Sequence, residues 1–119
     1  MRTPHADEIY KIATGEVFAA AKRAGRFDGM PIDHRDGFIH FSDGAQLRET
    51  LKLYFRGATD LVLLAVGAAD LGADLRWEAS RGGALFPHLY APLALEAIRW
   101  TAPIAVDADG HCDLPDRVE

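Results

Sequence analysis

The sequence predicts an α+β domain with mainly antiparallel sheets that form a cleft, and with two helices early in the chain. Two observations favour this class. Apolar and polar residues alternate at 8–13, 37–42 and 75–79, as is typical of half-buried strands. Two segments in which apolar residues have helical spacing follow the capping residues Thr14 and Asp43.

Length and composition indicate a single domain over residues 1–119, with its core at about 8–104 and a polar tail at 107–119. The chain is 49% hydrophobic and 26% charged, which is ordinary for a globular protein. A net charge of -5 gives no general attraction to nucleic acid or to anionic membranes. The single cysteine, Cys112, excludes an internal disulfide, and no apolar run is long enough for a membrane span. We expect a cytoplasmic monomer.

The first strand, at 8–13, places Lys11 among apolar residues. A lysine in this position either extends its amine to solvent at a sheet edge or faces a ligand. A helix is predicted at 16–24, and Gly25 should end it because glycine readily adopts the left-handed backbone that closes helices. Residues 26–36 contain glycine, proline and several charges, and are expected to form a loop.

The second strand, at 37–42, places His40 and Ser42 on one face. Asp43 and Gln46 have the spacing of a capping box, so the second helix should begin there. Its predicted buried stripe consists of Leu47, Leu51 and Tyr54.

Two strands in the second half of the chain should complete the sheets. Residues 61–66 are apolar on both faces, which predicts a central strand. Residues 95–104 alternate well enough for a strand that places Ile98 and Trp100 on one face, and Pro103 indicates a sheet edge.

The stretch from Arg76 to Leu93 has the highest density of side chains that could bind a ligand or take part in catalysis. Gly82 and Gly83 permit a sharp turn, and two prolines hold the following segment extended, so a shaped loop is expected after the strand at 75–79. Such loops on a rigid sheet often carry function. The alternative is a surface loop whose side chains only pack. The side chains with this potential are Arg76, Glu78, Ser80, Arg81, His88 and Tyr90.

His40 lies in a hydrophobic strand and has two interpretations. It is either a core histidine bonded to a backbone carbonyl or a group that faces a ligand. Ser42 shares its face, and both residues precede a helix whose N-terminus attracts anions. The ligand-facing interpretation is therefore favoured.

Two other site classes are disfavoured by spacing. The five histidines are too scattered for a zinc site, which usually needs three convergent protein ligands. No G-x-S-x-G segment occurs, so a serine hydrolase elbow is absent.

Three segments resemble a family of small, mostly bacterial domains known as domain of unknown function 952. They are IYKIAT, GFIHFSDGAQLRETLKLYF and LRWEASRGGALFPHLYAPL, and the resemblance covers Glu8 to about Trp100. That family is similar to compact, remote members of the ADP-ribosyltransferase superfamily. The resemblance implies two small sheets that form an NAD-binding cleft.

Individual positions can be compared with that superfamily. GFIHFSD resembles the G-I-Y-F-A-D stretch of poly(ADP-ribose) polymerase-like enzymes, which places His40 where a tyrosine stacks on nicotinamide. It also resembles the H-V-H-L-S stretch of the RNA 2′-phosphotransferases. IYKIAT resembles a W-H-G-S or Y-H-G-T strand, but Lys11 replaces the histidine and Ile12 the glycine. A third characteristic position of that superfamily commonly holds a glutamate. Near that position this chain has His88.

The resemblance implies cleavage of the nicotinamide–ribose bond through an oxocarbenium-like state. Such a site must hold a diphosphate, orient the ring and stabilise positive charge. The residues expected to be catalytic are His40, Glu78 and His88. The residues expected to bind NAD are Lys11, Ser42, Arg81 and Tyr90. No metal is expected.

Two classes of function remain open. The first is an NAD-dependent transferase of ADP-ribose or of a 2′-phosphoryl group, favoured by the set of His40, Arg81, His88 and Tyr90. The second is a module that binds a small molecule or nucleotide without turnover, favoured by the replacement of histidine by Lys11.

Overall fold

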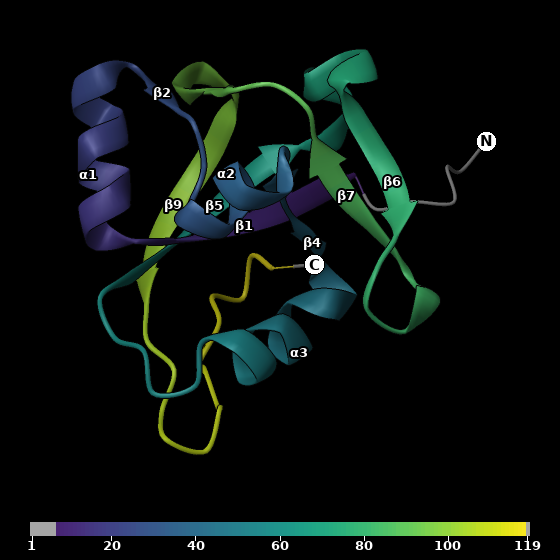
Figure 1. The fold of residues 1–119 in the computed structure, drawn as a ribbon. Helices are drawn as coiled ribbons and strands as arrows, with labels where there is room; N and C mark the ends of the chain where they lie inside the picture. Colours follow the sequence, from purple (N-terminus) through teal and green to yellow (C-terminus); the bar gives the residue numbers. More distant parts are fainter. Residues whose placement is uncertain (1–6, 119) are drawn as a thin grey trace.

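The computed structural model describes residues 7–118 and shows the predicted α+β fold with antiparallel sheets (Figure 1). The largest sheet has the strand order β4-β1-β5-β9. Its strands are β4 (Ser42–Asp43), β1 (Glu8–Thr14), β5 (Leu61–Gly67) and β9 (Ile98–Ile104). The prediction that β5 is central and that the last strand lies at an edge is confirmed.

A second sheet of three strands lies beside the first, in the order β3-β7-β6. It contains β3 (Ile39–His40), β7 (Leu85–Leu89) and β6 (Leu75–Ala79). The strand expected at 37–42 is therefore divided between two sheets, and Phe41 lies at the break, where its N–H donates to the Pro87 carbonyl at 2.9 Å. This division places His40 in one sheet and Ser42 in the other.

The strand β7 corrects the prediction of a loop after β6. The glycine-containing turn is real, since Gly82 and Gly83 have φ of 69° and 84°, but the chain then returns along β6 instead of forming an irregular loop. Pro87, which has no N–H to donate, lies in the interior strand β7 opposite Trp77, and its carbonyl accepts from Phe41 at the break between β3 and β4. A two-stranded sheet pairs β2 (Arg26–Phe27) with β8 (Leu93–Ala94).

Two helices begin where the sequence predicted. Helix α1 (Gly15–Ala24) follows Thr14, whose Oγ1 accepts a hydrogen bond from the Val17 N–H at 3.1 Å. Helix α3 (Gly44–Tyr54) has the predicted capping box, with Asp43 and Gln46 each bonding to the other's backbone N–H. The predicted buried stripe of α3 is wrong at its last position, because Tyr54 is 61% exposed.

A short third helix, α2 (Pro31–Asp36), corrects the loop expected at 26–36. Proline occupies its first turn, where a missing N–H costs nothing, and Gly37 closes it with φ of 85°. Six residues are too few for a stable isolated helix. The buried side chain of Asp33 supplies the tertiary contacts that hold α2 in place. Short 3-10 turns occupy Ala68–Asp74, Arg81–Gly83 and Leu95–Ala97.

Alternate residues of β1 belong to two different hydrophobic cores. Ile9 and Ala13 pack in the core beneath α1, whereas Tyr10 and Ile12 pack in the core beneath α3. The alternation expected for this strand is confirmed. The largest sheet is thus covered on both sides, and Lys11 faces the first side among apolar neighbours.

The last strand departs from the predicted alternation. Its pairing with β5 shifts between Ala65 and Val66, which lie opposite Trp100 and Ile98. This bulge inserts one residue and turns the two side chains to opposite faces. Ile98 packs against the first core and Trp100 against the second, so the prediction of a shared face is wrong.

The polar tail expected at 107–119 is described as far as residue 118, and together with residues 105 and 106 it packs against the largest sheet and α3. Val106 and Cys112 are buried in the second core, and Leu114 and Val118 pack against it. The guanidinium of Arg117 lies 4.6 Å from the centre of the Trp100 ring. Among the described residues, no helix has the length and apolar character to cross a membrane.

Candidate functional site

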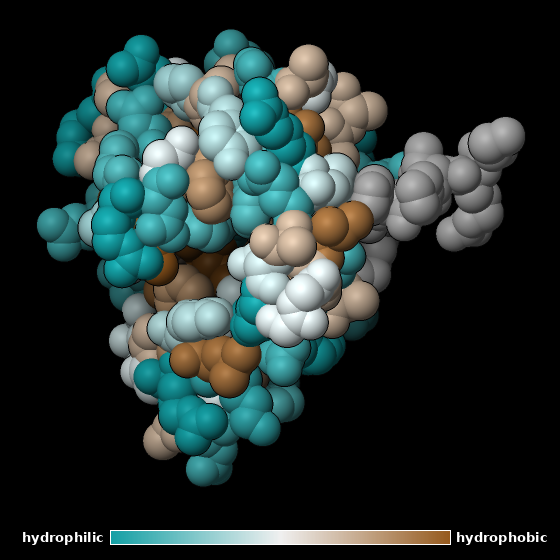
Figure 2. All heavy atoms as spheres, turned by 45° about the vertical axis from the view of Figure 1, so that its right-hand side comes forward, coloured by the Kyte–Doolittle hydropathy of each residue, from teal (hydrophilic) through white to brown (hydrophobic). Residues whose placement is uncertain are grey.

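A cavity of about 330 Å³ lies where the two larger sheets meet. Its walls come from β1, the β3–β4 segment, α2, the C-terminal half of α3 and the turn between β6 and β7. Figure 2 shows a face that is hollowed near its centre, with hydrophobic atoms visible in the depth of the hollow. The division of 37–42 between two sheets creates this site, because it lets His40 and Ser42 approach the same space from different sheets.

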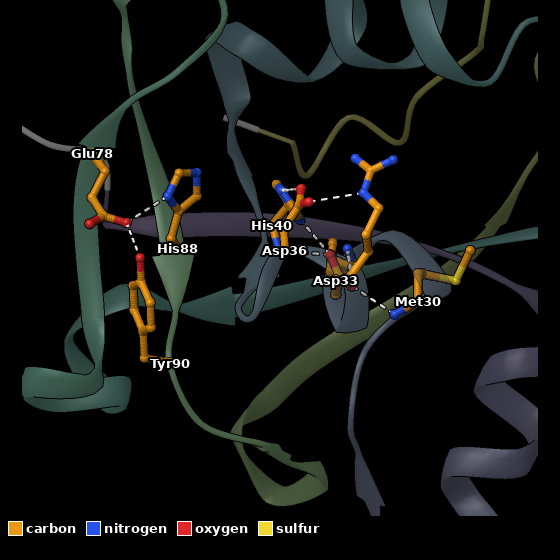
Figure 3. Close-up of polar contacts among 9 residues, drawn as sticks. Met30, Asp33, Asp36, His40, Glu78, His88 and Tyr90 are labelled. Atoms are coloured by element: carbon orange, nitrogen blue, oxygen red, sulfur yellow. Dashed lines mark hydrogen bonds and ion pairs between the residues drawn. The ribbon is translucent and has the colours of Figure 1, made fainter.

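A buried carboxylate joins one wall of the cavity to β1. Asp33 Oδ2 lies 2.7 Å from Lys11 Nζ. Asp33 Oδ1 lies 2.6 Å from His40 Nδ1 (Figure 3). Backbone N–H groups of Met30 and His40 also donate to this carboxylate, at 2.7 Å and 3.0 Å. Asp33 is therefore fully bonded, which a buried charge requires.

These contacts change the acidity of both buried partners. Burial alone would raise the pKa of Asp33, but the hydrogen bond from His40 and the nearby ammonium group of Lys11 outweigh it and lower the pKa to about 2. Burial lowers the pKa of Lys11, and its attraction to Asp33 offsets only part of that effect. Lys11 is thus an enclosed partner of Asp33 within the interior strand β1, not a lysine extended to solvent at a sheet edge.

Both ring nitrogens of His40 face carboxylates. Besides the Asp33 contact, its Nε2 lies 3.0 Å from Asp36 Oδ2. The hydrogen bond from Arg35 lowers the pKa of Asp36, so this carboxylate stays ionised. His40 lines the cavity, in agreement with its predicted orientation, but its polar atoms are engaged by protein groups and only its ring face is free to contact a ligand.

Arg81 lies at another wall, with its guanidinium group in contact range of two aromatic rings. Its Cζ is 4.6 Å from the centre of the Phe86 ring and 5.7 Å from that of Tyr54. One nitrogen donates to Thr50 Oγ1 at 3.3 Å, and another lies 3.7 Å from a carboxylate oxygen of the largely exposed Glu49. These cation–π contacts restrain the group, and its remaining N–H groups can donate to an anion.

Ser42 connects the Arg81–Thr50 hydrogen bond to the largest sheet. Its Oγ lies 3.0 Å from Thr50 Oγ1, and the Thr50 hydroxyl donates to the Gln46 carbonyl at 3.1 Å. Because the Thr50 hydrogen is used in that bond, Ser42 must be the donor of the pair. The Ser42 hydroxyl, which lines the cavity, therefore keeps its capacity to accept a hydrogen bond.

His88, Glu78 and Tyr90 form a second polar cluster. Glu78 Oε1 lies 2.8 Å from His88 Nδ1 and accepts a hydrogen bond from the Tyr90 hydroxyl at 2.6 Å (Figure 3). Phe38 stacks on the His88 ring, with the ring centres 4.1 Å apart and the planes at 28°. The His40 ring meets the same Phe38 ring at 4.5 Å. Packing therefore fixes the orientation of both imidazoles.

The hydrogen bonds in this cluster favour an ionised carboxylate. The hydrogen bond from Tyr90, followed by that from His88, lowers the pKa of Glu78. The same contact raises the pKa of the Tyr90 hydroxyl, because the negative carboxylate opposes loss of the phenol proton.

The structure brings five of the seven predicted site residues to the cavity and keeps two outside its lining. The five are Lys11, His40, Ser42, Arg81 and His88. Glu78 and Tyr90 lie behind His88, so the expected direct contact of these two with a bound nucleotide does not fit this arrangement. The strand β6 does not line the cavity, whereas the turn after it and β7 do.

Sequence reasoning missed residues that complete the site. Asp33 was assigned to a loop, and Thr50 and Phe38 were not proposed as partners of the polar residues. The contacts of Asp33 with Lys11, of Thr50 with Arg81 and of Phe38 with His88 join segments far apart in the chain, so no local spacing signals them. The described residues contain no group of three or more His, Cys, Asp or Glu side chains placed to hold a metal.

The sequence matches the model of a known protein family. A family model described as "Protein of unknown function (DUF952)" matches residues 12–101. The chain belongs to the DUF952 family. The match covers most of the described elements, from β1 into β9. The resemblance to this family inferred from the three sequence segments is confirmed.

Solved structures of protein CC0527 from Caulobacter crescentus are similar to this DUF952 chain. The crystal structure shares 52% identity over 93% of this chain and 97% of that one, with a TM-score of 0.88. The solution NMR structure shares 53% identity over 88% of this chain and 90% of the other, with a TM-score of 0.78. No match is found among curated proteins.

Proposed function

We propose that the cavity binds NAD or a related phosphate-bearing nucleotide, and that the protein transfers or cleaves ADP-ribose. The observation that carries this proposal is the seat of Arg81. Its guanidinium group lies near the rings of Phe86 and Tyr54 at the wall of a largely apolar cavity. A fixed guanidinium beside aromatic rings suits a ligand that combines a phosphate with a flat ring system.

Among the cations around the cavity, Arg81 is the most available to bind an anionic ligand. Lys11 is neutralised by Asp33 at 2.7 Å, and Arg35 bonds Asp36 at 3.0 Å. The carboxylate nearest Arg81 is 3.7 Å away, and its side chain is largely exposed. Displacing that weak surface contact costs little, since exposed pairs contribute at most about 1 kcal/mol. Arg81 is therefore the cation best able to exchange its partner for a phosphate.

Aromatic side chains offer the complementary surface for a ring. Tyr54, Phe41 and Phe86 all line the cavity with His40. The volume of about 330 Å³ is at the small end of the range for ligand pockets, roughly 300–1,000 Å³. One half of a dinucleotide suits this space, and the other half would extend across the solvent-facing rim.

The proposed reaction breaks the bond between nicotinamide and ribose. The electron pair of that C–N bond leaves with the pyridinium nitrogen, which becomes neutral nicotinamide, and an acceptor oxygen forms the new bond to the ribose carbon. The transition state has oxocarbenium character, as in glycoside hydrolysis. The resemblance of GFIHFSD to the ADP-ribosyltransferase superfamily supports this chemistry by analogy, with His40 at the ring-stacking position.

A nucleotide-binding module without turnover is the second candidate. One observation favours it specifically, which is the position of the acidic groups. Asp33 is enclosed by Lys11 and His40, and Glu78 does not line the cavity. Within the described chain, the carboxylate that does line it is Asp36, which is bonded to Arg35 and His40.

Titration calorimetry and nicotinamide release separate these functions. We expect NAD and ADP-ribose to bind at micromolar to millimolar concentration and free nicotinamide to appear on incubation with NAD. Binding without nicotinamide release supports the module. If neither ligand binds at millimolar concentration, the nucleotide proposal fails in both forms. The variant Arg23→Ala serves as a control because Arg23 lies on α1, away from the cavity lining.

A further inference from the structure

His88 is a buried imidazole with one polar atom left unused. Its side chain is 5% exposed, and it lines the cavity. Its Nδ1 is engaged by Glu78 at 2.8 Å, whereas Nε2 has no hydrogen-bond partner among the described residues. Every fully buried side-chain nitrogen or oxygen in the described part has a hydrogen-bond partner. Since Nε2 has none, it is not fully buried, and because His88 lines the cavity we infer that Nε2 is reached from there.

The partner of Nδ1 decides where the ring proton lies. Glu78 accepts hydrogen bonds from both His88 and Tyr90 through the same oxygen, and the Tyr90 bond in particular lowers the pKa of this carboxyl group. An ionised carboxylate can only accept, so a hydrogen bond to it requires the proton on Nδ1. The neutral imidazole then carries its lone pair on Nε2, toward the cavity.

The surroundings also fix the plane of the ring. Phe38 stacks on His88 at 4.1 Å between centres, and the His40 ring meets it edge-on at 5.5 Å. Figure 3 shows the second ring nitrogen of His88 on the side away from Glu78. A carboxylate that orients an imidazole whose other nitrogen faces a substrate space is the arrangement by which enzymes activate hydroxyl groups.

We propose that His88 is the general base of the cavity, and that Glu78 is its positioning residue, itself held in place by Tyr90. This inference rests on the proposed function for its reaction, but the His88–Glu78 pair can be tested without any nucleotide. The class of acceptor that follows is an oxygen nucleophile, either water or a substrate hydroxyl bound against Nε2. An amine that is protonated at neutral pH has no lone pair with which to attack the ribose carbon, so it is a poorer acceptor than water or a hydroxyl group.

The step balances within this scheme. The acceptor O–H gives its proton to His88 Nε2 as its oxygen forms the bond to the ribose carbon. The C–N bond to nicotinamide breaks in the same step, and its electron pair leaves on the nicotinamide nitrogen. The imidazolium that results carries a proton on each nitrogen, and the Glu78 carboxylate at 2.8 Å stabilises that charge.

The first test measures the proton position in the protein alone. In ¹⁵N-edited NMR at pH 8, with the His88 signals assigned by comparison with His88→Gln, we expect Nδ1 protonated and Nε2 bare. Glu78→Ala should shift the population toward the Nε2–H tautomer, whereas Glu96→Gln, which changes an exposed carboxylate outside the cavity lining, should not. A His88 ring protonated on Nε2 in the parent overturns the proposal.

The second test measures nicotinamide release from NAD. General base catalysis typically contributes about 10²–10⁴-fold, so His88→Gln should lower kcat by that factor with little change in KM. Glu78→Ala should lower kcat less, and Glu96→Gln should leave it unchanged. An unchanged kcat in His88→Gln would rule out the base. If the parent releases no nicotinamide, the ADP-ribosyl function fails, while the tautomer still decides whether the His88–Glu78 pair is built as a base.

Discussion

Lys11 Nζ and Asp33 Oδ2 lie 2.7 Å apart in the interior and join β1 to α2. Their side chains are only 6% and 1% exposed. The pair explains why a helix of six residues forms in a segment whose composition indicates a loop. It also means that one wall of the cavity depends on a pair of buried charges.

Removing one member of this pair should destabilise the protein strongly. Asp33→Asn leaves a buried ammonium group without its counter-charge, and such losses typically cost about 3–5 kcal/mol. Urea unfolding at pH 7 measures the change. The matched control is Asp28→Asn, which breaks the exposed pair between Arg26 and Asp28 and should cost less than about 1 kcal/mol. Equal effects of the two variants would contradict the structural role of Asp33.

Acid should unfold the protein partly through Asp33. Its pKa of about 2 in the folded protein lies below the usual value of 3.8, so it stabilises the fold at higher pH. That contribution, on the order of 2 kcal/mol, should be lost as the pH falls from about 4 toward 2. The free energy of unfolding, measured against pH, should fall less steeply in this window for Asp33→Asn than for the parent. Parallel curves would show that another carboxylate is responsible.

Arg81 should dominate the affinity for a phosphate-bearing ligand. Arg81→Ala should weaken NAD and ADP-ribose binding by about 1.5–3 kcal/mol, the range for hydrogen bonds to charged groups. Arg81→Lys should recover only part of this, because an ammonium group lacks the planar surface that packs against Phe86. Calorimetry on these variants and on Arg23→Ala provides the comparison. Unchanged affinity in Arg81→Ala would contradict the proposal that Arg81 binds the phosphate.

The thiol of Cys112 reports whether the C-terminal segment is packed. Burial raises its pKa, and the residue is 5% exposed, so both the thiolate fraction and access are reduced. Alkylation by iodoacetamide at pH 8 should be much slower in the folded protein than in urea. Labelling as fast as in a free peptide would indicate that 105–118 does not stay docked.

Local patterns in the sequence predicted the elements that rest on local physics. Capping side chains located the starts of α1 and α3, and alternation located β1 and β6. The predicted orientation of His40 toward a ligand-sized space follows from the same alternation. These signals act over a few residues, so a single chain carries them in full.

The missing parts depend on contacts between distant residues. Helix α2 is held by Asp33 through Lys11 and His40, and nothing near Asp33 in sequence announces that role. The strand β7 contains Pro87 and His88, which are typical of loops, and it forms because β6 and β3 pair with it on both sides. The bulge in β9 likewise arises in the pairing and leaves no mark on the sequence.

The alternation of β1 between two cores makes the domain one cooperative unit. A single strand supplies the inner wall of both, so neither core can lose its packing while the other keeps an intact surface. A slip of one residue in the β1 pairing would exchange the two sets of side chains and disrupt both cores together. We therefore expect no partly folded intermediate in which one core is melted and the other stays intact.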